Sequence, residues 1–125
     1  HIAKNMVAAG IADEVLVQVS YAIGVSKPTS ITVNTTNKHI DVTDGEIAKK
    51  ISQIFDMRPG MIEKRLKLRN PIYLETSAYG HMGKTPKTEI KIYKSSYSGE
   101  VTKEVELFTW EKLDYVDQLK AAFDL

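Results

Sequence analysis

The chain has 125 residues, 42% of them hydrophobic, which is enough for one core and favours a single domain over residues 1–125. Its 17 basic and 16 acidic residues leave a formal net charge of +1, so the charge of the whole chain does not favour binding to nucleic acid or to an anionic membrane. The absence of cysteine excludes disulfides, thiolate metal sites and cysteine nucleophiles, and it fits a reducing compartment.

The N-terminal part of the chain predicts a helix followed by two strands. Apolar residues recur at helical spacing before Gly10, which predicts a helix over residues 1–9. The β-branched alternation over residues 15–23 predicts a central strand, and residues 29–36 predict a strand antiparallel to it. The longest apolar runs, such as Val15–Val17, are too short to span a bilayer.

Two helices are expected in the middle of the chain. Thr43 and Glu46 match a capping box, in which each residue satisfies the other's backbone amide, so a helix should begin there. Its apolar face consists of Ile47, Ile51, Ile54 and Phe55. Pro59 is placed as the first residue of a second, short helix, and Asn70–Pro71 should end it.

The C-terminal part predicts a hairpin after a stretch without clear periodicity. Residues 71–83 are expected to be extended with loop character. Residues 88–107 predict a β-hairpin that turns at residues 95–99 and buries one face, since Ile90 and Ile92 alternate with polar residues. We expect this hairpin to serve packing or assembly and to lie away from any catalytic centre.

A final helix should follow, capped by Asp114 and carrying an apolar stripe of Val116, Leu119 and Phe123. The predicted fold class is therefore α+β: a small antiparallel or mixed sheet with helices packed on one face, a C-terminal hairpin and a terminal helix.

Motifs for catalysis are absent from the sequence. The three histidines, His1, His39 and His81, have no partners at metal-ligand spacing, so no metal site is predicted. His81 lies between glycines and is interpreted as a histidine hydrogen-bonded in a turn. The chain has neither a Gly-x-Ser-x-Gly elbow nor a glycine-rich phosphate loop, so no catalytic residue is assigned to it.

One basic cluster offers an alternative reading as a nucleic-acid surface. It lacks interleaved aromatic residues for base stacking, and a solvated helix face explains it more simply. We therefore predict no nucleic-acid partner and no membrane partner. The cluster consists of Arg58, Lys64, Arg65, Lys67 and Arg69.

Several segments in order resemble the S-adenosylmethionine synthetase (methionine adenosyltransferase) family, and the resemblance runs from His1 to about Lys84. A further block near the C-terminus resembles the family's Phe-Pro-Trp-Glu, with Thr109 in place of proline. The segments are Ala3–Gly10, Gln18–Val25, Pro28–Ile31, Phe55–Pro59, Tyr79–Gly83 and Phe108–Lys112.

This resemblance implies that the chain is the C-terminal part of a cytoplasmic enzyme that makes S-adenosylmethionine from ATP and L-methionine with Mg²⁺ and K⁺. The family is built from three similar α+β domains, and its subunits form a dimer of dimers. Its metal-binding and triphosphate-binding residues precede the segment seen here, so the chain alone is expected to be inactive. A start at His1 in place of methionine favours a processed or truncated chain.

Two residues of the Tyr-Ala-Ile-Gly segment are implied to contact ATP. By the resemblance, Ile23 packs on the adenine ring, and Ala22 beside it lets the ligand approach the backbone. The alternative for Ile23 is a strand-end residue of the core, since burial of an aliphatic side chain is favourable against either surface.

An insertion of about residues 85–107 departs from the commoner family pattern, in which a shorter link occupies this place. The alternative to the enzyme as a whole is a free-standing α+β binding or interaction module without catalysis.

Overall fold

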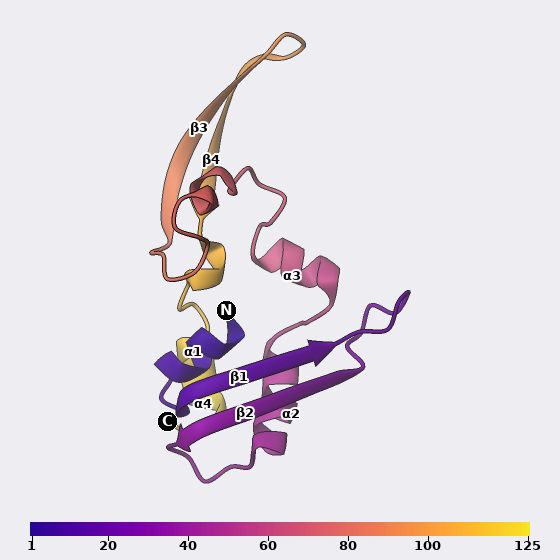
Figure 1. The fold of residues 1–125 in the computed structure, drawn as a ribbon, viewed down its shortest axis with the longest axis vertical. Helices are drawn as coiled ribbons and strands as arrows, with labels where there is room; N and C mark the ends of the chain where they lie inside the picture. The colour runs from indigo at the N-terminus through magenta and orange to yellow at the C-terminus, as the bar shows by residue number, and fades with distance from the viewer. The chain divides into compact units, whose positions relative to one another are not determined.

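The computed structural model describes all 125 residues, which divide into two compact units (Figure 1). The first unit contains residues 1–62 and 113–125, and the second contains residues 63–112. Each unit holds one antiparallel two-stranded sheet, so the predicted α+β class is confirmed. The expectation of one domain over residues 1–125 stays a prediction.

The first unit places helices on one face of the sheet formed by β1 (Ala12–Ser20) and β2 (Ser30–Lys38). Its helices are α1 (Ile2–Ala8), α2 (Asp44–Ile54) and α4 (Val116–Ala122). The core combines the inward-facing side chains of the sheet with one stripe from each helix, as binary patterning requires. Its members include Val15, Val17, Val33, Met6, Ile47, Ile51 and Leu119.

The expectation of a central strand that continues to Ile23 is wrong in two respects. β1 ends at Ser20, and only β2 lies beside it in the sheet. Leu16, on the face opposite the core, is exposed. Apolar residues beyond Ser20 therefore belong to a loop, where alternation of side chains no longer reports a buried face.

Local signals set the ends of α1 and α2 as expected. Gly10 takes a φ of +86°, and its amide donates to the Val7 carbonyl at 3.0 Å, which closes α1. At the start of α2, the Glu46 amide donates to the Thr43 hydroxyl at 3.3 Å and the Thr43 amide donates to the Glu46 carboxylate at 3.0 Å. The capping box is thus confirmed.

Two predicted helix boundaries need correction. Asp114 does not cap α4, because its carboxylate lies 2.8 Å from Nε2 of His1 and Tyr115 occupies the cap position. α3 (Pro59–Arg65) begins at Pro59 as expected but ends before Asn70, since Lys67 adopts a left-handed φ of +53°. None of the helices is long and apolar enough to cross a membrane.

The second unit is built on the hairpin of β3 (Lys87–Ser95) and β4 (Gly99–Leu107), which confirms the predicted hairpin and its turn. Two 3₁₀ turns flank it, η1 (Leu74–Ser77) and η2 (Thr109–Glu111). The small core gathers at the base of the hairpin. Its residues are Ile72, Val105, Leu107 and Phe108, with Leu68 and Trp110 packed against them.

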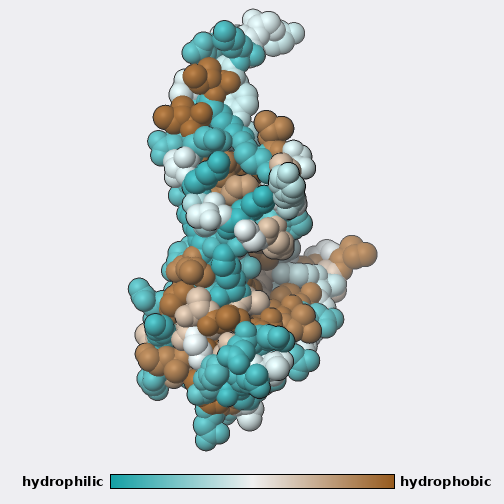
Figure 2. Space-filling view, turned by 60° about the vertical axis from the view of Figure 1, so that its left-hand side comes forward, coloured by the Kyte–Doolittle hydropathy of each residue, from teal (hydrophilic) through white to brown (hydrophobic).

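The hairpin buries the opposite face of β3 from the one expected. Ile90 and Ile92 are 65% and 60% exposed, and Figure 2 shows hydrophobic side chains at the surface of the hairpin. Lys91, on the other face, donates to the Pro71 carbonyl at 2.7 Å and pairs with Glu75 at 2.8 Å. The covered face of β3 is therefore held by polar contacts, which apolar alternation cannot predict.

Candidate functional site

The loop over residues 21–29, which joins β1 to β2, is the candidate site. Its ends are fixed at the edge of the sheet. The Thr29 amide donates to the Ser20 carbonyl at 2.8 Å, and the Ser20 hydroxyl lies 2.9 Å from that of Thr29 and 2.6 Å from that of Ser30. The loop therefore starts and finishes at one defined place.

A tight turn presents Ile23 at the surface of this loop. The Val25 amide donates to the Ala22 carbonyl at 3.1 Å, and Gly24 at the third position of the turn has a φ of +80°. A turn with positive φ at this position strongly favours glycine, because other residues are strained there. Ile23 consequently occupies the second position, at the corner of the turn.

Ile23 is fully exposed, with 106% of its reference surface accessible, and Ala22 is exposed beside it. The alternative that Ile23 is a core residue at the end of a strand is therefore wrong for this chain. An aliphatic side chain held at a turn with no packing of its own is suited to an external apolar surface, such as the face of an aromatic ring.

The segment that follows α2 meets the start of the same loop. The Tyr21 hydroxyl donates to the Met57 carbonyl at 2.5 Å, and the Met57 side chain is buried. Asp56 and Arg58 flank Met57, and the Arg58 guanidinium donates hydrogen bonds of 2.6 and 2.9 Å to the Asp56 carboxylate. This hydrogen-bonded pair raises the pKa of Arg58 above its usual value.

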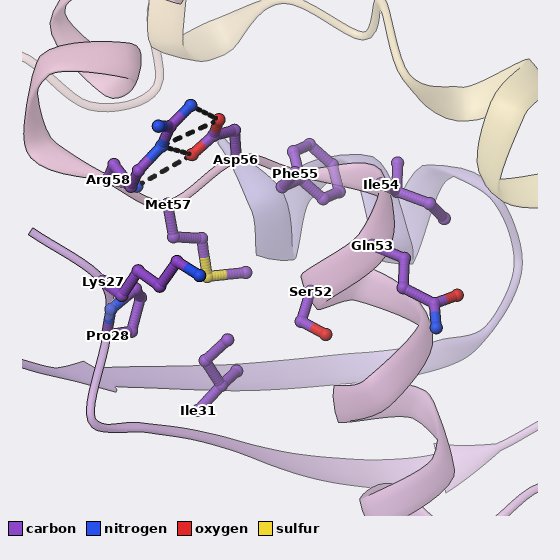
Figure 3. A pocket seen from close by; sticks show the side chains of 10 residues that line it. All are labelled: Lys27, Pro28, Ile31, Ser52, Gln53, Ile54, Phe55, Asp56, Met57 and Arg58. Carbon is purple, nitrogen blue, oxygen red and sulfur yellow. Dashed lines mark hydrogen bonds and ion pairs between the residues drawn. The ribbon is translucent and has the colours of Figure 1, made fainter.

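An open pocket of about 500 Å³ lies between the last part of this loop and the end of α2 (Figure 3). Lys27 and Pro28 line it from the loop, Ile31 from β2 and residues 52–58 from α2 and the segment after it. Asp56 and Arg58 neutralise each other at its wall. The residues that line the pocket include no paired nucleophile and base. Ile23 is not among the residues that line it.

The three histidines do not converge on a metal. His1 pairs with Asp114 and His39 lies 2.7 Å from Asp13, while the His81 carbonyl accepts a hydrogen bond from the Trp110 indole at 2.7 Å. No group of three or more histidine, cysteine, aspartate or glutamate side chains lies close enough to hold a metal ion.

The basic cluster is largely paired within the chain. Besides the Asp56–Arg58 pair, Arg69 pairs with Glu63, and Lys67 lies 3.0 Å from Glu106. Hydrogen bonds from Lys112, which has the larger effect, and from Lys67 lower the pKa of Glu106. Local pairing therefore accounts for the charges of Arg58, Lys67 and Arg69.

The Tyr79–Gly83 segment is anchored by the block around Trp110, within the second unit. The buried Glu111 accepts the Gly83 amide at 3.0 Å, next to the contact between Trp110 and His81. Thr109, which takes the place of proline, donates its hydroxyl to the Leu66 carbonyl at 2.6 Å. The two blocks thus form one structural contact, with no assigned role in binding.

The family resemblance points to Ile23 and Ala22, whose contact with ATP stays a prediction, and the sequence gives no sign of the bond between Tyr21 and Met57. In the sequence, Tyr21 continues the alternation of residues 15–23 and is therefore predicted to lie in the strand. The Met57 contribution is a backbone carbonyl, which leaves no mark in the residue pattern.

Comparison with known proteins gives one consistent result. The family model described as "S-adenosylmethionine synthetase, C-terminal domain" matches residues 1–94. An S-adenosylmethionine synthase of Christiangramia forsetii is 68% identical over the whole chain, and one of Bacteroides thetaiotaomicron is 67% identical. The chain covers 30% and 29% of these two proteins, respectively, so it spans about a third of their length.

A solved structure agrees with these sequence matches. The structure described as that of an unusual S-adenosylmethionine synthetase from Campylobacter jejuni is 32% identical, with a TM-score of 0.72. The match covers 97% of this chain and 27% of that one.

Proposed function

Because this chain belongs to the S-adenosylmethionine synthetase family and matches its C-terminal domain, we propose that it is the C-terminal part of an enzyme that forms S-adenosylmethionine from ATP and L-methionine. The methionine sulfur attacks the ribose C5′ carbon, triphosphate leaves, and the triphosphate is hydrolysed before release. Such a displacement depends on alignment of the two reacting atoms and on neutralisation of the leaving group.

The role of this chain in that reaction is to bind the adenine end of ATP. Ile23 packs on the adenine ring, and Ala22 leaves room for the ligand beside the backbone. The observation that carries this proposal is the full exposure of Ile23 at the corner of a turn in a loop whose base is closed by the hydrogen bond from the Thr29 amide to the Ser20 carbonyl. Because the turn fixes the backbone at Ile23, binding has to order only the side chain and not the loop.

The family's Mg²⁺ and K⁺ would be held elsewhere in the parent protein. Within this chain, no three or more histidine, cysteine, aspartate or glutamate side chains come together as a candidate metal cluster. No catalytic residue is assigned to this chain. Its contribution is binding and subunit structure.

The remaining expectations follow from the family and belong to the parent enzyme. Its substrates are ATP and L-methionine, it assembles as a homo-oligomer made of two dimers, and it acts in the cytoplasm. No nucleic-acid or membrane partner is proposed.

The test is Ile23→Asp in the full-length protein that contains this domain. A carboxylate in place of the aliphatic side chain removes the apolar contact and repels the polyanionic ligand, so KM for ATP should rise much more than KM for methionine. Ile90→Asp is the matched control, because Ile90 is also an exposed isoleucine but lies on the hairpin of the second unit. Equal changes in both KM values, or no change, would show that Ile23 does not contact the adenine.

A further inference from the structure

The first residue after β1 ties the candidate adenine loop to a different part of the first unit. Among residues 21–29, the Tyr21 hydroxyl makes the one hydrogen bond that reaches beyond the β1–β2 hairpin, to the Met57 carbonyl. We propose that Tyr21 is a positioning residue: through this bond, Tyr21 orients Ile23 toward the adenine ring of ATP. The proposal rests on the proposed function of Ile23.

The other hydrogen bonds of the loop leave its direction free. Those between Thr29 and Ser20 close the base, and the one between Val25 and Ala22 closes the turn at the tip. Both sets lie within the hairpin itself, so the loop could pivot about its base without breaking either. The bond from Tyr21 to Met57 removes this freedom, because Met57 belongs to the segment after α2.

The acceptor of this bond is itself well fixed. Phe55 and Met57 are 1% and 3% exposed, so two alternate side chains of the segment are anchored in the core. The residues between and after them, Asp56 and Arg58, pair with each other, and the Arg58 amide also donates to the Asp56 carboxylate at 3.2 Å. The Met57 carbonyl is therefore a rigid reference point for the loop.

Tyr21 is also close enough to Ile23 in the sequence to affect the direction in which the Ile23 side chain points. Only Ala22 separates them, and Ala22 is already constrained by the turn that Gly24 closes. Holding the Tyr21 ring in one direction therefore limits where the corner of the turn can point. Binding of adenine to a loop held in this way avoids the entropic cost of ordering the loop.

The test is Tyr21→Phe in the full-length protein, which removes one hydroxyl and keeps the ring. Loss of a single hydrogen bond of this kind should raise KM for ATP about three- to tenfold. KM for methionine and the turnover number should stay within about twofold, since the proposed role of Tyr21 concerns only the adenine end of ATP. Hydrolysis of added inorganic tripolyphosphate, which has no adenine, should be unchanged. If Tyr21 had a purely structural role, the turnover number and the rate of tripolyphosphate hydrolysis would fall together.

The matched control is Tyr73→Phe. The Tyr73 hydroxyl also donates to a backbone carbonyl, that of Leu68, but within the second unit. Its loss should leave KM for ATP unchanged even where it lowers the melting temperature. A rise in KM for ATP in both variants would mean that the effect of Tyr21 is not specific to the loop, and would overturn the proposal.

A double-mutant cycle with Ile23→Ala separates this inference from the proposed function. If Tyr21 acts through Ile23, Tyr21→Phe should add less than twofold to KM for ATP once Ile23 is alanine, because coupled residues are not additive. Full additivity, or no effect of Tyr21→Phe alone, would overturn the positioning role while leaving the adenine contact intact. Absence of an effect of Ile23→Ala and Ile23→Asp would instead overturn the adenine contact on which both depend.

Discussion

Two glycines of the first unit, Gly24 and Gly45, lie in different backbone conformations. Gly24 takes a φ of +80° in the turn that presents Ile23, whereas Gly45 lies in the first turn of α2. A Cβ atom would meet nothing within 4 Å at either position, so side-chain clashes play no part. The difference between the two residues is purely one of backbone conformation, which makes them a clean comparison.

We expect Gly24→Ala to destabilise the full-length protein by about 1 kcal/mol, because a left-handed conformation strains an L-residue. It should also raise KM for ATP, as the turn that carries Ile23 relaxes. Gly45→Ala should stabilise the protein by about 0.5 to 1 kcal/mol, since alanine loses less backbone entropy in a helix. Thermal unfolding and ATP kinetics of the two variants check both signs. A stabilised Gly24→Ala variant would contradict the role assigned to the turn.

At the scale of elements, the hairpin of β3 and β4 is divided into a base and an outer part. Val105 and Leu107 at the base belong to the core of the second unit, whereas Ile90, Ile92 and Val101 farther along are exposed. Between these parts, Lys91 on the covered face of β3 pairs with Glu75. This pairing lowers the pKa of Glu75. The base is therefore needed for folding, and the outer part is available for contacts with other surfaces.

We expect the outer part to be dispensable for catalysis and to serve packing or assembly in the parent enzyme. Lys91 and Lys103 face each other across the hairpin, so residues 92–102 can be replaced by a short glycine-serine turn that joins them and keeps the core and the Lys91 contacts. The turnover number should stay within a few-fold, while the melting temperature falls or the oligomer weakens. Kinetics, thermal unfolding and sedimentation measure the three properties. A hundredfold loss of turnover in a folded, correctly assembled variant would show that the hairpin reaches the active site.

Across the whole molecule, features set by neighbouring residues were predictable from sequence, and features set by distant contacts were not. The capping box of Thr43 and Glu46 and the start of α3 at Pro59 depend on a few adjacent residues, and both are confirmed. By contrast, the face that β3 buries depends on how Lys91 meets Pro71. The family resemblance points to Ile23 as an adenine contact, but its exposure depends on the turn at Gly24, which only the structure shows.

The distribution of charged groups over the whole chain leads to the last prediction, that the isolated 125-residue chain makes no S-adenosylmethionine. The chain brings together no group of three or more histidine, cysteine, aspartate or glutamate side chains, and its sequence has no glycine-rich loop for the triphosphate. Loss of even one preorganised charge-stabilising contact typically costs about 2.7 to 4 kcal/mol of transition-state stabilisation, and the family resemblance implies that the whole set precedes this segment in the parent enzyme. The measurement is product formation from ATP and methionine by the purified chain, with circular dichroism to establish that it is folded. The full-length enzyme under the same conditions is the positive control. Product made by the folded chain, free of full-length enzyme, would show that the catalytic groups lie within these residues after all.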